Sequence, residues 1–201
     1  MSDGRLDDTL RAIDDANAED PNELTVDGET GPKELVHGQM MTSWVRRLDP
    51  EATDLQLIAA RAHHFRRWTT PRSEHPEGRS GYLRWRTAAR TQHAGAVSSL
   101  LTEKGFDAAE IDRVSEIIRK EHRATDPAVQ THEDALCLVF LQTQLGDITV
   151  QLGEEQTADV LVKSIRKMSP RGVEAALGLD LAEPGRSVFD RVVGRSDADA
   201  G

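Results

Sequence analysis

Apolar residues recur every three or four positions along most of the chain, and no stretch alternates apolar and polar residues as a half-buried strand does. A helical period of this extent limits the possible folds more than any other feature of the sequence. It predicts helices at about residues 6–13, 32–48, 50–68, 82–104, 108–122, 131–145, 154–168 and 171–177. We therefore expect an all-α fold, a single compact domain of about seven to eight helices.

The longest apolar run, residues 135–141, lies in a segment that is apolar nearly all round, 131–145. Such a helix is expected at the centre of the fold. The run is far shorter than the roughly 20 residues that cross a bilayer, and the N-terminus does not read as a signal peptide. The sequence therefore predicts a cytoplasmic protein with no membrane partner. The one cysteine, Cys137, lies in this run and is expected to be an inert core thiol.

A chain of 201 residues is long enough for one domain with a sizeable core, and a second full domain is not expected. Residues 1–178 are predicted to form the helical domain, and residues 179–201 a weakly structured tail. Prolines and glycines interrupt the helical pattern at residues 19–31 and again at 69–81. The second of these loops is long for a compact domain, and long ordered loops are often functional.

Charge is unevenly distributed along the chain. The net charge of −10 disfavours indiscriminate binding to nucleic acid, and residues 1–34 carry eleven acidic against three basic residues. Residues 61–90 reverse this balance with eight arginines and two glutamates, so this segment could attract an anion. Basic residues are mostly arginine and acidic ones lean towards aspartate, which is typical of a salt-adapted (halophile-like) or GC-rich archaeal or bacterial source. A well-solvated surface explains the same bias equally well.

All seven histidines fall within residues 37–132; they are His37, His63, His64, His75, His93, His122 and His132. His75 lies in the polar loop and His132 is interpreted as a helix-start residue. His93 stands four and seven residues before apolar positions of its helix, and Asp134 has the same spacing on the central helix, so both are expected to point inward. His122 ends the apolar stripe of its helix.

A single inward histidine is most often a satisfied core residue. Several inward histidines from successive helices, together with an inward aspartate, are the ingredients of a divalent metal site with nitrogen and oxygen ligands. A purely structural polar network remains the alternative interpretation.

The order of these residues resembles that of the HD-domain phosphohydrolases. The matching pieces are His37, Ala59-Ala-Arg-Ala-His63-His64-Phe65, His93-Ala-Gly-Ala-Val, Ile111 to His122, and His132-Glu-Asp134-Ala-Leu. The members of that superfamily are helical and ligate metal through a histidine, a His-Asp pair, sometimes two further histidines, and a final aspartate. The resemblance covers about residues 33–145 and implies an HD-domain-like bundle. It departs at the defining pair, where this chain has His63-His64.

A closer resemblance, to domain-of-unknown-function family 4202 (DUF4202), covers most of the chain. It is carried by Ala12 to Pro21, Ala60 to Trp68, Pro71-Arg72, Gly81 to Arg86, His93-Ala94, Glu133 to Leu141 and Lys167-Met-Ser-Pro. The family pattern fits His64, His93 and Glu133-Asp134 best, while positions 37 and 63 need not be histidine in it. The resemblance implies no established activity. Lys167 to Ser169 are interpreted as a helix C-terminus.

Aromatic residues alternate with arginines on either side of the long loop. Arginine forks suit phosphate and aromatic faces suit bases, so Arg72, Arg79 and Arg86 are candidates for binding a substrate phosphate. The alternative is that Trp68 and Trp85 anchor the core while most arginines pair with the acidic N-terminal segment.

The leading hypothesis is a metal-dependent phosphohydrolase or phosphodiesterase that acts on a nucleotide or another phosphorylated small molecule. It needs one divalent transition metal, Mn, Fe, Zn or Ni, and its predicted ligands are His64, His93 and Asp134, with further candidates His37, His63 and His122. Glu133 is the predicted acceptor of the proton of water, and Lys120 balances developing charge together with Arg72 and Arg79. The alternative is a non-catalytic module that binds RNA or nucleotides, and a third reading is a protein-interaction scaffold.

Overall fold

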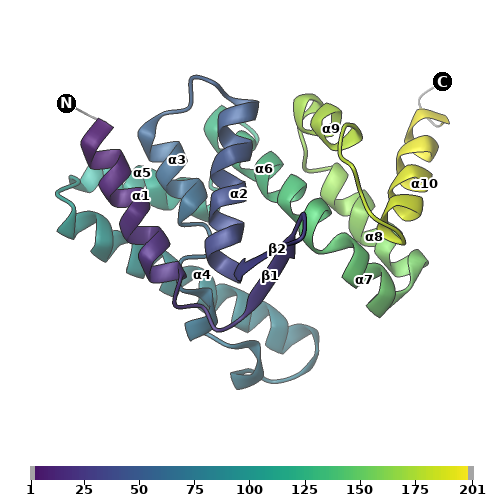
Figure 1. The fold of residues 1–201 in the computed structure, drawn as a ribbon, viewed down its shortest axis with the longest axis horizontal. Coiled ribbons are helices and arrows are strands. Elements are labelled where there is room, and N and C mark those ends of the chain that lie inside the picture. Colours follow the sequence, from purple (N-terminus) through teal and green to yellow (C-terminus); the bar gives the residue numbers. More distant parts are fainter. Residues whose placement is uncertain (1–2, 199–201) are drawn as a thin grey trace. The chain divides into compact units, whose positions relative to one another are not determined.

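The computed structural model describes residues 3–198, which are mostly helical (Figure 1). Contacts within the chain divide it into two compact units, Met1–His132 and Glu133–Gly201. The predicted all-α class is confirmed, with one small two-stranded sheet in the described part of the chain. The boundary between the two units falls within α6 (Pro127–Thr143), and the single domain 1–178 stays a prediction.

The first unit contains the N-terminal helices and the sheet. Its elements are α1 (Asp3–Asn17), β1 (Glu23–Val26), β2 (Glu29–Pro32), α2 (Lys33–Leu48), α3 (Asp54–Arg61), the 3-10 turns η1 (Arg67–Thr69) and η2 (Arg72–Glu74), α4 (Gly78–Glu103), α5 (Ala108–Arg119) and the first part of α6 (Pro127–Thr143). The helix α3 packs against α1, α2 and α5, and is thus the centre of this unit.

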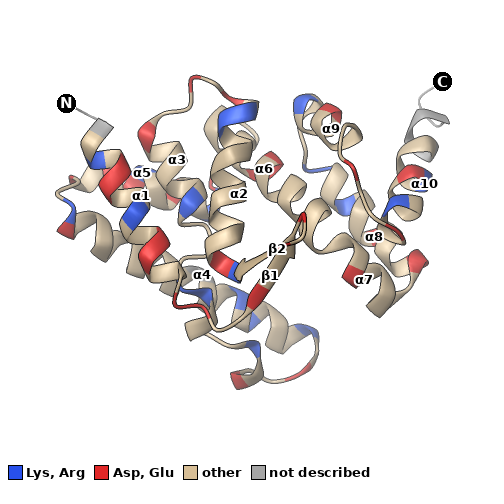
Figure 2. Ribbon diagram, in the orientation of Figure 1, with Lys and Arg blue, Asp and Glu red and all other residues tan. Residues whose placement is uncertain are grey.

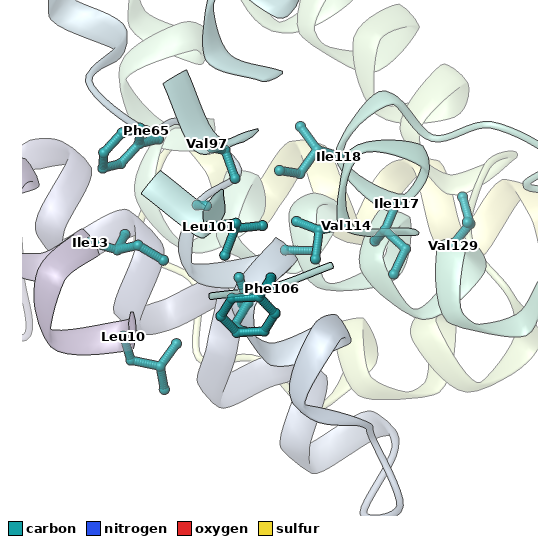
Figure 3. Close-up of a cluster of buried hydrophobic side chains, with 13 residues drawn as sticks. Leu10, Ile13, Phe65, Val97, Leu101, Phe106, Val114, Ile117, Ile118 and Val129 are labelled. Atoms are coloured by element: carbon teal, nitrogen blue, oxygen red, sulfur yellow. The ribbon is translucent and has the colours of Figure 1, made fainter. Parts of the chain in front are cut away.

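The apolar faces predicted from the helical period meet in one core (Figure 3). Ile13, Ile58, Val97, Val114 and Ile117 contribute to it from α1, α3, α4 and α5, and each is completely buried. Burying such side chains stabilises a fold by about 1.5–3 kcal/mol each. The core therefore fixes the relative positions of the helices whose other residues are discussed below.

Two local features define α3. Thr53 caps its N-terminus in a reciprocal capping box with Gln56, which satisfies two backbone N–H groups. Gly38 of α2 lies against the other end of α3, where a Cβ atom at this position would come within 2.6 Å of the Arg61 carbonyl oxygen. The glycine therefore permits the close approach of α2 and α3.

The second unit consists of the remainder of α6 and four further helices, α7 (Leu145–Leu152), α8 (Glu154–Ile165), α9 (Pro170–Leu177) and α10 (Gly185–Ala198). The helix α10 packs against α7 and α8 through the buried side chains of Val188, Phe189 and Val192. A weakly structured tail was predicted for 179–201, but residues 185–198 form a helix because these three apolar residues lie on one helical face; residues 199–201 lie outside the described residues.

Other element boundaries also differ from the prediction. The stretch 19–31, predicted to be irregular, contains the antiparallel hairpin of β1 and β2. Its turn is Asp27-Gly28, in which both residues have positive φ (52° and 83°), as a tight hairpin turn requires. The helix expected over 50–68 runs only from 54 to 61, and the one expected to reach His122 ends at Arg119. Residues left outside both helices include His63, His64 and Lys120.

Within the described residues, no single helix has both the length and the apolar character of a membrane span. The helices α6 and α7 pass that test only as a pair, with a bend of 63° between them.

Candidate metal centre

Five of the seven histidines come together in the first unit. They are His37 on α2, His63 and His64 in the turn after α3, His93 on α4 and His132 on the first part of α6. We refer to these five residues as the histidine cluster. Four separate segments supply it, and three of them, the turn after α3, α4 and the first part of α6, contribute side chains to the core described above.

The rings of the cluster follow one another closely. The centroids of His37 and His64 are 4.3 Å apart and the two rings are stacked, while His63 and His64 are 4.6 Å apart. His93 adjoins His64 at 6.4 Å. On the other side, Nε2 of His132 lies 2.8 Å from Nδ1 of His63, a hydrogen bond between two imidazoles. His64 is therefore the central ring of the cluster.

A carboxylate and a guanidinium contact this central ring. Oε2 of Glu34 lies 3.0 Å from Nδ1 of His64, and Nη1 of Arg67 lies 2.6 Å from Nε2 of the same ring. Because a guanidinium can only donate, Nε2 must be the accepting nitrogen, and Nδ1 therefore carries the proton that is donated to Glu34. The two neighbours together fix the tautomer of His64.

Two buried polar side chains, Asn17 at the end of α1 and Asp20 just after it, position Glu34 and the segment that carries His64. Oδ2 of Asp20 accepts a hydrogen bond from the backbone N–H of Glu34 (3.0 Å). Asn17 donates to the Glu34 carbonyl through Nδ2 (3.4 Å), and its Oδ1 accepts from the backbone N–H of Arg66 (3.0 Å). Asn17 thus ties the segment that carries Glu34 to the segment that carries His64. The motif Ala12 to Pro21 therefore contributes residues that hold the segments carrying Glu34 and His64 in place.

Burial keeps the cluster neutral. It disfavours the charged imidazolium and lowers the pKa of His37 and His93 to about 4 and that of His132 to about 3. The pKa values of His63 and His64 are also well below the usual 6.5, for the same first cause. Near neutral pH the five rings are therefore uncharged, and each has one nitrogen with a lone pair.

Glu34 responds to burial in the opposite direction. Loss of water raises the pKa of its carboxyl group, and the positive charge of Arg67 and the proximity of His37 and Lys33 oppose this effect. A cation bound beside the carboxylate would restore the stabilisation that water no longer provides.

The donor atoms fit a divalent metal. Glu34, His37 and His64 offer one ligand atom each, and these three atoms lie within 4.8 Å of one another. Within the described residues, Nδ1 of His37 and Nε2 of His93 are buried without a hydrogen-bond partner. Unprotonated imidazole nitrogens and a carboxylate are the ligands used by Zn²⁺, Fe²⁺, Mn²⁺ and Ni²⁺. The chemistry of this donor set therefore matches a transition-metal site.

The sequence-predicted ligands are distributed over both units. His64 and His93, together with His37 and His63, lie in the histidine cluster of the first unit. His122 is exposed, has a positive φ of 58° and makes no ring contact with the cluster within the described residues. Reasoning from the sequence placed it on a helix that in fact ends three residues earlier.

Asp134 and Glu133, both buried, belong to the second unit. The two oxygens of Asp134 accept hydrogen bonds from the backbone N–H (2.8 Å) and the hydroxyl (2.5 Å) of Ser169, the residue that caps α9. Gly172 packs so tightly on Asp134 that a Cβ atom would come within 2.6 Å of its carboxyl carbon. Glu133 lies 4.0 Å from Nζ of Lys167. The Lys167-Met-Ser-Pro motif is therefore not a helix C-terminus; it leads into α9, because α8 ends at Ile165.

The remaining candidates lie around the long loop and α5. Lys120 ends α5 in the left-handed conformation, and its charge lowers the pKa of His63, His64 and His132. Arg72 donates to the carbonyl of His75 (2.8 Å). Arg79 and Arg86 are exposed, on the segment of α4 where Figure 2 shows blue bands.

One residue of the histidine cluster and two of its neighbours were missed by reasoning from the sequence. Glu34 stands three residues before His37, a spacing that puts two side chains on one helical face, so this signal was available. His132 was assigned to a helix start, although it follows Val129 by three residues on the buried stripe. Arg67 had no distinguishing signal among eight neighbouring arginines.

The family described as a domain of unknown function (DUF4202) matches residues 7–189, nearly the whole chain. The protein therefore belongs to this family, and the predicted membership is confirmed. Neither the curated proteins nor the solved structures contain a match to the chain. The more distant resemblance to HD-domain phosphohydrolases stays a prediction.

Proposed function

We propose that the first unit binds one divalent transition metal ion through Glu34, His37 and His64, with His93 as a further ligand, and that the protein is a metal-dependent hydrolase of phosphate esters. The observation that carries this proposal is the convergence of three ligand atoms within 4.8 Å in a buried, uncharged set of imidazoles. Asp134 as a ligand and Glu133 as a proton acceptor stay predictions from the sequence.

The geometry agrees less well with the alternative interpretation, a purely structural polar network. In such a network buried donors and acceptors are paired, whereas His37 and His93 each hold a buried nitrogen without a partner in the described residues. Leaving a buried polar atom unpaired costs about 1–3 kcal/mol. A metal ion ligated by either nitrogen would remove this cost for that nitrogen.

Different residues have different roles in the proposed hydrolysis of a phosphate ester. Glu34, His37 and His64 hold the cation, and Asn17 and Asp20 keep Glu34 in place. A bound divalent ion lowers the pKa of its water towards neutrality and polarises a phosphoryl oxygen. Arg67, which carries a fixed positive charge beside His64, supplies the group that suits an oxyanion. Water replaces the alcohol on phosphorus, giving the free alcohol and phosphate.

The test combines metal analysis with an assay of phosphate release. The purified chain should contain, or take up from Mn²⁺, Fe²⁺, Zn²⁺ or Ni²⁺, about one ion per chain, and it should release phosphate from some member of a panel of nucleotides, sugar phosphates and a generic phosphodiester. The Glu34→Gln and His64→Gln variants should bind the ion more than about 100-fold more weakly, because loss of a group that merely orients a ligand already costs 10–100-fold. The exposed His122→Gln is the matched control and should behave as the unaltered protein.

Two results would contradict the proposal. A folded protein that takes up none of the four ions removes the metal site. Uptake of one ion without hydrolysis of any substrate in the panel, by protein whose variants lose the ion as expected, removes the enzymatic part.

A second candidate function is a non-catalytic module that binds RNA or nucleotides. It is favoured by one observation: α4 exposes Arg79, Arg84 and Arg86 beside Tyr82, whose exposed fraction is 45%. Arginine with an exposed aromatic face suits single-stranded nucleic acid. This candidate would be supported if RNA affinity falls steeply with salt concentration, and falls less steeply in the Arg86→Ala variant. This result would not bear on the proposed metal site, which is tested by metal analysis.

A further inference from the structure

Arg67 contacts one of the two nitrogens through which His64 could ligate a metal ion. Its Nη1 lies 2.6 Å from Nε2 of His64, while Nδ1 of this ring faces Glu34 at 3.0 Å. Both nitrogens of the central ring are therefore engaged in the structure. His64 can ligate a cation through Nε2 only after the guanidinium has moved away.

Electrostatic repulsion also prevents the Arg67 guanidinium and a metal ion from both lying against His64. A guanidinium and a divalent cation within a few ångström of each other repel strongly in a partly buried site. The side chain of His64 is 16% exposed and that of Glu34 only 7%, so solvent screens this repulsion poorly. The charge of Arg67 also reaches Glu34, His37 and His93, since it contributes to the pKa shift of each.

The surroundings of Arg67 define where the guanidinium can go. Its carbon Cζ lies 5.1 Å from the centre of the Trp85 ring, close enough for a cation–π contact. Nε1 of Trp85 donates to the carbonyl of Thr70 (2.8 Å), which fixes the ring. The backbone before Arg67 is fixed as well, because the N–H of Arg66 donates to Asn17. With this ring and this backbone held in place, a rotation of the Arg67 side chain alone would release His64.

A guanidinium displaced from an imidazole needs a new acceptor. The acceptor that fits its planar fork and its charge is a tetrahedral oxyanion with two accessible oxygens, such as the phosphoryl group of a phosphate ester. Such an anion would also reduce the repulsion between the guanidinium and the metal ion.

We propose that Arg67 is the oxyanion-binding residue of this centre, and that its exchange between His64 and a bound oxyanion makes metal binding and oxyanion binding mutually favourable. The inference rests on the proposed metal site and names its substrate class, a molecule that carries a terminal tetrahedral oxyanion. By linkage, the oxyanion tightens metal binding by the same factor by which the metal tightens oxyanion binding.

The test measures the dissociation constant of Mn²⁺ by titration calorimetry, with sodium sulfate as the oxyanion and sodium chloride of equal ionic strength as the reference. Sulfate should tighten Mn²⁺ binding to the unaltered protein by about 5-fold or more, within the usual range of coupling between sites. Arg67→Met keeps the length of the side chain but has no charge and no donor. It should bind Mn²⁺ more tightly than the unaltered protein in chloride and should show no effect of sulfate.

Two further variants make the test specific. Arg67→Lys keeps the charge and should retain part of the sulfate effect. Arg84→Met removes an exposed arginine of α4 outside the cluster and should retain all of it. These measurements use binding alone and need no substrate.

The outcomes separate this inference from the function on which it rests. Mn²⁺ binding that is equal in Arg67→Met and the unaltered protein, or a sulfate effect that persists in Arg67→Met, overturns the role of Arg67 while the metal site stands. Absence of Mn²⁺ binding from all the proteins, in sulfate and in chloride, overturns both.

Discussion

Lowering the pH from about 7.5 to about 5.5 should destabilise the first unit strongly, because five buried histidines must stay neutral in the folded state. In the unfolded chain each of them has an ordinary pKa of 6.5. Unfolding between these pH values therefore takes up protons, and the free energy of unfolding must fall as the pH falls. The loss begins near pH 6.5 and ends only near the folded pKa values, about 4 for His37 and His93.

The size of the effect follows from linkage. A histidine that is neutral in the folded state and titrates at 6.5 in the unfolded state costs about 1.4 kcal/mol over this interval, so five cost about 7 kcal/mol. Glu34 acts in the opposite direction, since burial raises its pKa and lets the folded state bind a proton, and it offsets part of this loss. A loss of several kcal/mol is comparable to the whole stability of many domains.

Urea unfolding in the presence of a chelator measures this loss. All three tryptophans, Trp44, Trp68 and Trp85, lie in the first unit, so their fluorescence reports on it. The His93→Gln variant should unfold with about one proton less taken up, because the pKa of His93 is lowered to about 4 in the folded state. A stability that changes by less than about 1 kcal/mol between the two pH values would refute the reasoning, because five neutral histidines require a loss several times larger.

Two further predictions concern packing and the second unit. Gly38→Ala should lower the free energy of unfolding by about 1–3 kcal/mol, because the new methyl group would come within 2.6 Å of the Arg61 carbonyl oxygen. The control Gly95→Ala, whose methyl group meets nothing on the exposed face of α4, should raise the free energy of unfolding by about 0.5–1 kcal/mol. Equal effects of the two substitutions in urea unfolding would contradict the close contact of α2 and α3. Asp134→Asn should increase hydrogen exchange in α9, because one donor of Ser169 loses its acceptor at a cost of about 1–3 kcal/mol; unchanged exchange combined with weaker metal binding would instead make Asp134 a ligand.

The helices of the first unit could be predicted from sequence because their apolar spacing is regular. The prediction for α2, 32–48, agrees with the observed Lys33–Leu48 within one residue. The hairpin was missed although its Asp27-Gly28 turn is a strong local signal, because its strands are only four residues long and largely exposed. The end of α3 could not be predicted from the sequence, because the residues after Arg61 continue the helical pattern of apolar residues although their backbone is no longer α-helical.

The candidate site was predictable only in part. Inward spacing indicated His93 and Asp134, and the family resemblance favoured His64, His93 and Glu133-Asp134, but neither indicated Glu34. Glu34 and Asp134 are both buried on helices, and the spacing and the resemblance favoured Asp134. Which side chains meet depends on how helices far apart in sequence pack, and periodicity within one helix does not contain that information.

The central claim is that Glu34, His37 and His64 hold one metal ion, and a crystal structure of the protein grown with Zn²⁺ tests it most directly. Anomalous scattering measured at the zinc absorption edge locates the ion without reference to any activity. The account predicts one strong peak about 2.0–2.2 Å from a carboxylate oxygen of Glu34 and from one imidazole nitrogen each of His37 and His64, with the Arg67 guanidinium turned away from His64. A peak bound elsewhere, or none at this cluster at saturating Zn²⁺, would contradict it.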